Sequence, residues 1–348
     1  MMQIPFFRFD GITDEVRASL EEILSSGRLT RGKFTKLFEE EFARYLGVPF
    51  LKTVNSGTTA LYAALRAVDV KDQFVVVPAL SFMATVDAVI LAGGKPLVVD
   101  VDETYTLDLN QLEDAVKRYP VKAVVPVHLF GNMADTEAIR DLSQRYGFFV
   151  VEDAAQAHGA ELKGVKAGAW GDAAAFSFYA TKNVAMGEGG AVAATNPSVA
   201  ERLQKLLDFG EEPAFNFRLS EFQSAVGLHS LRKLDENNRR RREIAARYNE
   251  SFEGRFGLQK ERGYCVYHVY SLRHPQRDLI VKMLNERGVA TKVYYSYLLH
   301  ELRETEHLPT PFAERLRDEL FALPIYPSLT DEEVSFVIET VLQVLEEL

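Results

Sequence analysis

Short apolar runs alternate with amphipathic segments between residues 51 and 194, and this alternation limits what the chain can fold into. The runs 74–77 and 148–151 have no polar residue at every second position, so both of their faces are predicted to be covered. The segments 85–92 and 109–119 carry apolar residues at helical spacing. This β-α-β-α order predicts an α/β fold in which helices flank a mainly parallel central sheet.

The pattern changes after this α/β part, where a long charged helical stretch (232–252) begins. Later segments read as a strand, further helices and a terminal amphipathic helix, with Thr330 as its N-cap and Glu333 three positions on. A chain of 348 residues is long enough for two domains. We therefore expect a large α/β domain over residues 1–230, N-terminal segment included, and a smaller α+β domain over residues 231–348.

Composition and charge exclude several classes of protein. A net charge of −10 argues against the basic surface that nucleic acid requires. No run approaches the roughly 20 apolar residues of a membrane span, and the N-terminus lacks the features of a signal peptide. The single cysteine, Cys265, fits a reducing compartment, and the seven scattered histidines make a poor metal site. We expect a cytoplasmic protein that binds neither nucleic acid, membrane nor metal.

Residues that directly follow predicted strands are the candidates for ligand binding, because ligands bind at the carboxyl ends of strands in open α/β sheets. Lys182 lies between the apolar run 173–178 and a glycine-rich turn. A lysine amine forms Schiff bases with carbonyl compounds and with pyridoxal phosphate when its surroundings lower its pKa. Ser177 ends the same run and could donate to a phosphate; the alternative is an ordinary serine at a strand edge that faces water.

The turn at residues 55–58 leads directly from one predicted strand into a helix. Gly57 allows the backbone to approach a ligand and Thr58 adds a hydroxyl, so the start of this helix is a candidate phosphate site. The alternative is an ordinary helix cap formed by Ser56 or Thr58.

Asp153 follows the run 148–151 and needs a cation or several hydrogen-bond donors, because an unpaired carboxylate is costly to bury. A protonated pyridine nitrogen is such a partner, and it makes the ring an electron sink. Gln156 could reach a ring oxygen, and Phe82 could lie flat against the ring. The alternatives are a helix cap for Asp153 and a core aromatic for Phe82. Together with Lys182, these residues predict a pyridoxal phosphate site.

At these residues the chain resembles the DegT/DnrJ/EryC1/StrS family of sugar aminotransferases, which are pyridoxal phosphate enzymes of fold-type I. The resemblance covers nearly the whole chain, and its most specific motif is Ser177-Phe-x-x-x-Lys-x-x-x-x-Gly-Glu-Gly-Gly. The other motifs, in chain order, are Asn55-Ser-Gly-Thr, Pro78-x-x-Ser-Phe-x-Ala-Thr, His128-Leu-Phe-Gly and Glu152-Asp-Ala-Ala-Gln-Ala-His-Gly.

The resemblance implies a role for each candidate residue. It implies that Lys182 is the Schiff-base lysine, that Asp153 pairs with the pyridine nitrogen, and that Gln156 contacts the 3-oxygen of the ring. The other cofactor contacts that it implies are a stacking ring from Phe82, phosphate contacts from Gly57, Thr58 and Ser177, and Asn216 supplied by the partner subunit. It therefore implies a homodimer with shared active sites.

The reaction that the resemblance implies is transfer of an amino group from an amino acid, L-glutamate, to a keto-sugar. The acceptor would be a nucleotide-linked 3- or 4-keto-6-deoxyhexose, with Tyr179 and His300 as the candidate sugar contacts. Two alternatives remain open: an aminotransferase for a keto-cyclitol or an amino-shikimate-type ring, and a regulator that binds pyridoxal phosphate without catalysis.

Overall fold

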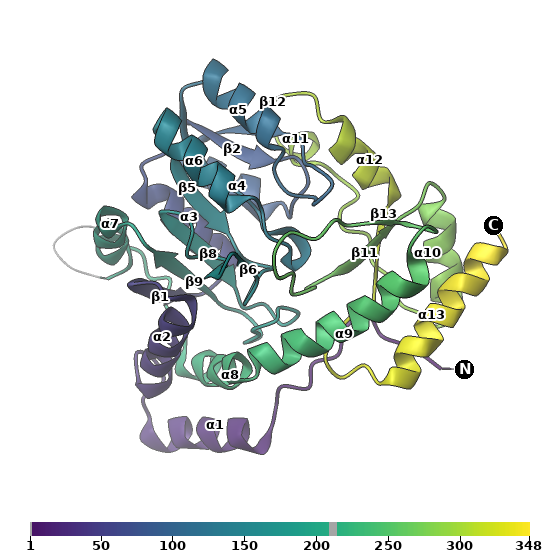
Figure 1. The fold of residues 1–348 in the computed structure, drawn as a ribbon. Coiled ribbons are helices and arrows are strands. Elements are labelled where there is room, and N and C mark those ends of the chain that lie inside the picture. Colours follow the sequence, from purple (N-terminus) through teal and green to yellow (C-terminus); the bar gives the residue numbers. More distant parts are fainter. Residues whose placement is uncertain (1, 209–213) are drawn as a thin grey trace.

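The computed structural model describes residues 2–208 and 214–348, and its centre is an eight-stranded sheet in the order β1-β9-β8-β5-β4-β2-β3-β12 (Figure 1). The strands are β1 (Phe50–Val54), β2 (Phe74–Pro78), β3 (Lys95–Val99), β4 (Val121–Val124), β5 (Phe149–Asp153), β8 (Ala173–Ser177), β9 (Gly190–Ala194) and β12 (Glu306–His307). All neighbours pair in parallel except β9, which is antiparallel to both β1 and β8. The predicted α/β class with a mainly parallel sheet is confirmed.

Helices cover both faces of this sheet, as the apolar runs predict. The covering helices are α3 (Gly57–Ala67), α4 (Ala84–Leu91), α5 (Leu109–Arg118), α6 (Thr136–Tyr146) and α7 (Pro197–Leu207). Val75 and Val77 lie in one buried cluster with α3, α4 and α7, whereas Val76 lies in another with α5 and α6. Successive strand residues point to opposite faces, so the absence of alternation in this run reflects burial on both sides.

The chain before β1 and the hairpin after β5 form a second layer around α8. The elements are α1 (Asp14–Ser26), α2 (Lys33–Leu46), α8 (Glu221–Arg232), β6 (Glu161–Leu162) and β7 (Val165–Lys166). Glu221, at the start of α8, accepts hydrogen bonds from the backbone N–H groups of Gly32 and Phe34, both at 2.8 Å. Because a carboxylate is favourable at a helix N-terminus, Glu221 ties the start of α2 to α8.

The C-terminal part has a three-stranded antiparallel sheet and a buried cluster of its own. Its elements are α9 (Leu234–Phe252), β10 (Gly257–Leu258), β11 (Tyr270–Arg273), α10 (Arg277–Glu286), α11 (Leu299–Leu302), α12 (Pro311–Glu319), β13 (Leu320–Leu323) and α13 (Asp331–Glu346). The predicted capping box of Thr330 and Glu333 begins α13. Among the described residues, no helix combines the length and the apolar character that crossing a membrane requires.

The two parts of the chain exchange segments. Ile4 bridges to Val289 and belongs to the C-terminal cluster, while β12 adds to the edge of the large sheet beside β3. Figure 1 shows the N-terminal end of the chain close to α13, and the Arg8 guanidinium donates to Glu333 in that helix at 2.9 Å. The domain boundary between residues 230 and 231 stays a prediction.

The register of the sheet gathers several strand ends at one edge. Strands β1 and β8 run in the same direction because both are antiparallel to β9, and Gly190 is opposite Val54 on one side and Ser177 on the other. Strand β5 is parallel to β8 and ends at Asp153. The turn into α3, Ser177 and Asp153 therefore meet at the same edge of the sheet.

Candidate active site

A cavity of about 410 Å³ opens at this edge and collects most of the residues that the sequence predicts. Eight of the ten predicted site residues line it: Gly57, Thr58, Phe82, Asp153, Gln156, Ser177, Tyr179 and Lys182. They come from the start of α3, the segment before α4, the end of β5 and the turn that follows it, the end of β8, and the segment between β8 and β9.

Lys182 lies in a looped segment that the backbone holds at both ends. The N–H of Phe178 donates to the carbonyl of Gly189 at 2.8 Å, and the N–H of Lys182 donates to the carbonyl of Tyr179 at 2.9 Å. The amine has no hydrogen-bond acceptor in the part of the chain that the structure describes. Burial lowers the pKa of Lys182 to about 8, against the opposing effect of the Asp153 carboxylate. A substantial fraction of this amine is therefore neutral near pH 8, as a nucleophile or a base requires.

Asp153 is buried at the end of β5 and is held by two donors. Its Oδ2 accepts from the Thr85 hydroxyl at 2.9 Å, and its Oδ1 accepts from the backbone N–H of Ala155 at 3.2 Å. Burial raises the pKa of Asp153, and these hydrogen bonds oppose the rise. No lysine or arginine among the described residues forms an ion pair with it. A buried carboxylate without a cation fits the pyridinium N–H of pyridoxal phosphate.

Thr85 also lines the cavity. It is the last residue of the motif that begins at Pro78, and the sequence alone predicted no role for it. Its hydroxyl lies 2.8 Å from the Ser81 hydroxyl, and both side chains are buried in the wall of the cavity. The series of hydrogen bonds from Ser81 through Thr85 thus fixes the Oδ2 of the Asp153 carboxylate. The other oxygen keeps lone pairs for a ligand, because its one donor is the N–H of Ala155.

Two neighbours fix the orientation of Gln156. Its Oε1 accepts from the backbone N–H of Phe130 at 2.8 Å, and its Nε2 donates to the Tyr295 hydroxyl at 3.0 Å. Burial raises the pKa of Tyr295, so this phenol keeps its proton. Both Gln156 and Tyr295 line the cavity and offer donors to a ring oxygen. Sequence reasoning assigned no role to Tyr295.

The start of α3 has the geometry of a phosphate site. Ser56 is the N-cap, and its hydroxyl accepts from the N–H of Thr59 at 3.1 Å. The N–H groups of Gly57 and Thr58 find no acceptor among the described residues, as expected for the first turn of a helix. A Cβ at Gly57 would lie 2.6 Å from the Cβ of Ser177, so only glycine lets these two segments approach so closely. Ser56 therefore forms an ordinary cap that still leaves two N–H groups available to a phosphate.

The aromatic side chains at the mouth of the cavity are exposed. Phe82 is 50% exposed and Tyr179 is 48% exposed, so neither is a core aromatic. The ring of Phe82 is 6.2 Å from that of Tyr295, centroid to centroid. An exposed ring at this mouth suits stacking on a planar ligand.

Two predicted site residues do not line the cavity of their own chain. Asn216 is exposed between α7 and α8, and its contact with a partner subunit stays a prediction. His300 lies in α11, where its ring stacks on that of His307 at 4.5 Å between centroids. The neighbouring Tyr294 and Tyr295 line the cavity instead, so the geometry gives no support to a sugar contact by His300.

Glu152 and His128, two further motif residues, form hydrogen bonds that hold the end of β5 in place. The Glu152 carboxylate accepts from the backbone N–H groups of Gly168 and Gly171 at 2.9 and 2.7 Å. It also lies 2.8 Å from the Nε2 of His128, whose Nδ1 accepts from the N–H of Ala134 at 3.1 Å. Successive strand residues point to opposite faces, so Glu152 anchors β5 while Asp153 faces the cavity.

The fold and the cavity together define a class of protein, the enzymes that bind pyridoxal phosphate through a lysine at the edge of an α/β sheet. Within that class the chain belongs to the DegT/DnrJ/EryC1/StrS aminotransferase family, whose model matches residues 10–342. It is thus a pyridoxal phosphate-dependent aminotransferase.

Individual relatives support this assignment over the full length. The dTDP-3-amino-3,4,6-trideoxy-alpha-D-glucose transaminase of Micromonospora megalomicea subsp. nigra is 37% identical over 95% of each chain. The crystal structure of S. venezuelae DesV in complex with a ketimine intermediate is 35% identical, covers 100% of both chains and has a TM-score of 0.93. That of NtdA from Bacillus subtilis with bound cofactor PMP is 30% identical over 99% of this chain and 86% of its own, with a TM-score of 0.89.

Proposed function

We propose that this protein transfers the amino group of an amino acid, L-glutamate, to a nucleotide-linked 3- or 4-keto-6-deoxyhexose in the cytoplasm. The observation that carries the proposal is the cavity where Lys182 lies with Asp153, Gln156 and the open start of α3. The printed name of the Micromonospora relative, a transaminase of a dTDP-linked amino sugar, supports a nucleotide sugar as the acceptor.

The place of each residue in the cavity supports its proposed role. The start of α3 and the Ser177 hydroxyl hold the phosphate of the cofactor, Asp153 keeps its pyridine nitrogen protonated, and Gln156 and Tyr295 hold its ring oxygen. Bound pyridoxal phosphate supplies an electron sink for the negative charge left when a proton departs from the amino-acid carbon. Lys182 takes and returns that proton at its Nζ, which its pKa of about 8 permits.

The charge of the cavity supports a shared site in a homodimer. Lys182 is the one lysine or arginine among the described residues that line it. The diphosphate of a nucleotide sugar and the carboxylates of an amino acid all need cations or several donors. We infer that a second copy of the chain supplies them, together with Asn216 at the phosphate.

A panel of substrates tests the proposal. Purified holoenzyme is given L-glutamate and, in separate reactions, dTDP-, UDP- and GDP-linked 3-keto and 4-keto sugars, and products are scored by mass and regiochemistry. We expect one keto-sugar series to gain an amino group. Amination of a keto-cyclitol alone would favour the cyclitol alternative, and failure of glutamate to bleach the yellow holoenzyme would favour the regulator.

A further inference from the structure

A second cavity, of about 320 Å³, lies behind the segment that carries Lys182. Tyr179 and Thr181 line the first cavity. Ala180 and Asn183 line the second, and Lys182 lines both. The lysine segment therefore forms a common wall between the two cavities.

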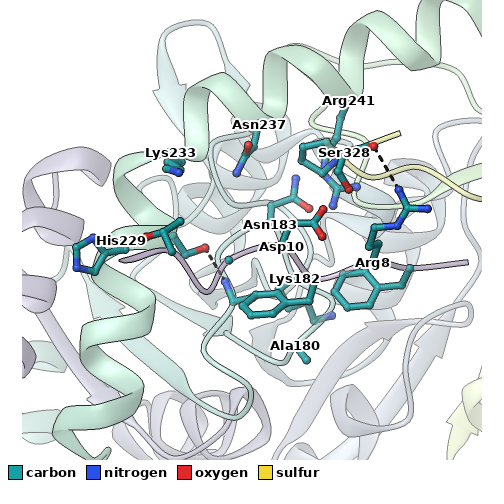
Figure 2. A pocket seen from close by; sticks show the side chains of 17 residues that line it. Arg8, Asp10, Ala180, Lys182, Asn183, His229, Lys233, Asn237, Arg241 and Ser328 are labelled. Carbon is teal, nitrogen blue, oxygen red and sulfur yellow. Dashed lines mark hydrogen bonds between the residues drawn. The ribbon is translucent and has the colours of Figure 1, made fainter. Parts of the chain in front are cut away.

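The opposite wall of this second cavity is a row of polar side chains on α9. Figure 2 shows Asn237 and Arg241 on this helix and Lys233 at its N-cap, above the N-terminal segment 7–13 that closes the other side. Asn237 and Arg241 are four residues apart and lie on one face of the helix, which Lys233 precedes. The wall thus carries a cation at each end.

Arg241 is a buried cation without an acidic partner. It is 3% exposed, and its Nη1 donates to the backbone carbonyls of Tyr267 and Ile325 at 3.2 and 2.7 Å. Its Nε and Nη2 have no acceptor in the described part of the chain. Burial alone lowers the pKa of Arg241 to about 10, which leaves it charged at neutral pH. An uncompensated buried charge is costly, so an anion beside Arg241 would be favourable.

The other charges of the cavity leave one free cation and one free carboxylate. Lys233 forms no ion pair among the described residues, and Asp10 is the one carboxylate in the described lining. Arg8 is already paired with Glu333 at 2.9 Å. Burial lowers the pKa of His229, so its ring is neutral at pH 7. Lys182 would add no free cation to this cavity, because the cofactor would hold its amine.

We propose that this second cavity binds an acidic amino acid, with its two carboxylates at Lys233 and Arg241 and its ammonium group at Asp10. Two cations and one carboxylate are the complement of L-glutamate. The volume of the cavity suits a small ligand of this kind. The site is separate from the transamination cavity, so it does not depend on which sugar is the acceptor.

Calorimetry on the borohydride-reduced holoenzyme tests the site, because reduction keeps the cofactor on Lys182 and prevents reaction with amino acids. The probes are L-glutamate, L-aspartate and glutarate, which lacks the ammonium group. We expect Lys233→Ala to weaken glutamate and glutarate by about tenfold each, since each loses a charge-assisted contact. Asp10→Asn should weaken glutamate and leave glutarate unchanged or tighter.

The matched control is Arg239→Ala, which removes the same charge from an exposed position of α9 outside the cavity. Glutamate binding equal to wild type in this variant supports the site. Absence of saturable binding, or an equal loss in Arg239→Ala and Lys233→Ala, overturns it. An unchanged preference for glutamate over glutarate in Asp10→Asn also overturns it. Bleaching of the yellow form by glutamate reports separately on the proposed function.

Discussion

Replacing Thr85 by valine should weaken the hold of the protein on its cofactor while leaving the fold intact. The substitution keeps the shape of the side chain and removes the hydroxyl that donates to Asp153 Oδ2 at 2.9 Å. Asp153 would then keep a single donor, the N–H of Ala155 at 3.2 Å. A hydrogen bond to a charged group contributes about 1.5–3 kcal/mol, so the ionised carboxylate loses about that much stabilisation.

The loss should appear in cofactor binding, because we propose the ionised Asp153 as the partner of the pyridinium N–H. At about 1.4 kcal/mol per factor of ten, the Kd for pyridoxal phosphate should rise about 10- to 100-fold. Titration of the apoprotein with pyridoxal phosphate, followed by absorbance, measures this Kd. The rate of the glutamate half-reaction should fall as well, since a weaker ion pair makes the ring a poorer electron sink.

The matched control is Thr85→Ser, which keeps the hydroxyl and removes only a methyl group. It should bind pyridoxal phosphate nearly as the wild type does. The reasoning is refuted if Thr85→Val binds the cofactor with unchanged Kd and reacts with glutamate at the wild-type rate, or if the serine variant is impaired as severely as the valine variant. Thermal unfolding of the apoproteins shows whether either substitution disturbs the fold.

Three further predictions concern the phosphate cradle, the lysine and the dimer. Gly57→Ala places a Cβ 2.6 Å from the Ser177 Cβ; overpacking of this kind costs about 1–3 kcal/mol, and titration should show a weaker Kd for pyridoxal phosphate. Because the base must be neutral and the pKa of Lys182 is about 8, the single-turnover rate with glutamate should fall as pH drops below 8; a rate that does not change from pH 6 to 9 contradicts this. Lys182→Ala and Asn216→Ala should each be inactive alone. Equal mixing after subunit exchange should restore about a quarter of wild-type activity, because half of the dimers would hold one intact site; no recovery would contradict a shared site.

Local pattern was enough to predict which residues gather at one cavity, because the ligand-binding residues of a parallel sheet follow directly after its apolar runs. Asp153, Ser177 and Gly57 each stand within a few residues of a strand end, and the register brings all three together. The direction of β9 could not be predicted in this way. Its run, Gly190–Ala194, is apolar like the parallel strands of the sheet, and only the antiparallel pairing with β1 and β8 places the α3 turn at the same edge.

The residues that sequence reasoning missed come from contacts that span long stretches of chain. Tyr295 meets Gln156 across 139 positions, and no local signal distinguishes it from the packed tyrosines beside it. His300 has the polarity of a ligand residue, but its helix turns it toward His307 and away from the cavity lining. Thr85 is the last residue of the motif that begins at Pro78, yet its hydroxyl donates to Asp153, 68 positions later in the sequence.

The central claim is that Lys182 is the lysine that binds pyridoxal phosphate. Borohydride reduction of the yellow holoenzyme fixes the cofactor to whichever amine holds it, and digestion followed by mass spectrometry identifies that residue. The account predicts the cofactor mass on the peptide that contains Lys182, and a loss of both label and yellow colour in Lys182→Ala. A label on another lysine, or a yellow Lys182→Ala variant that still turns over, would contradict it.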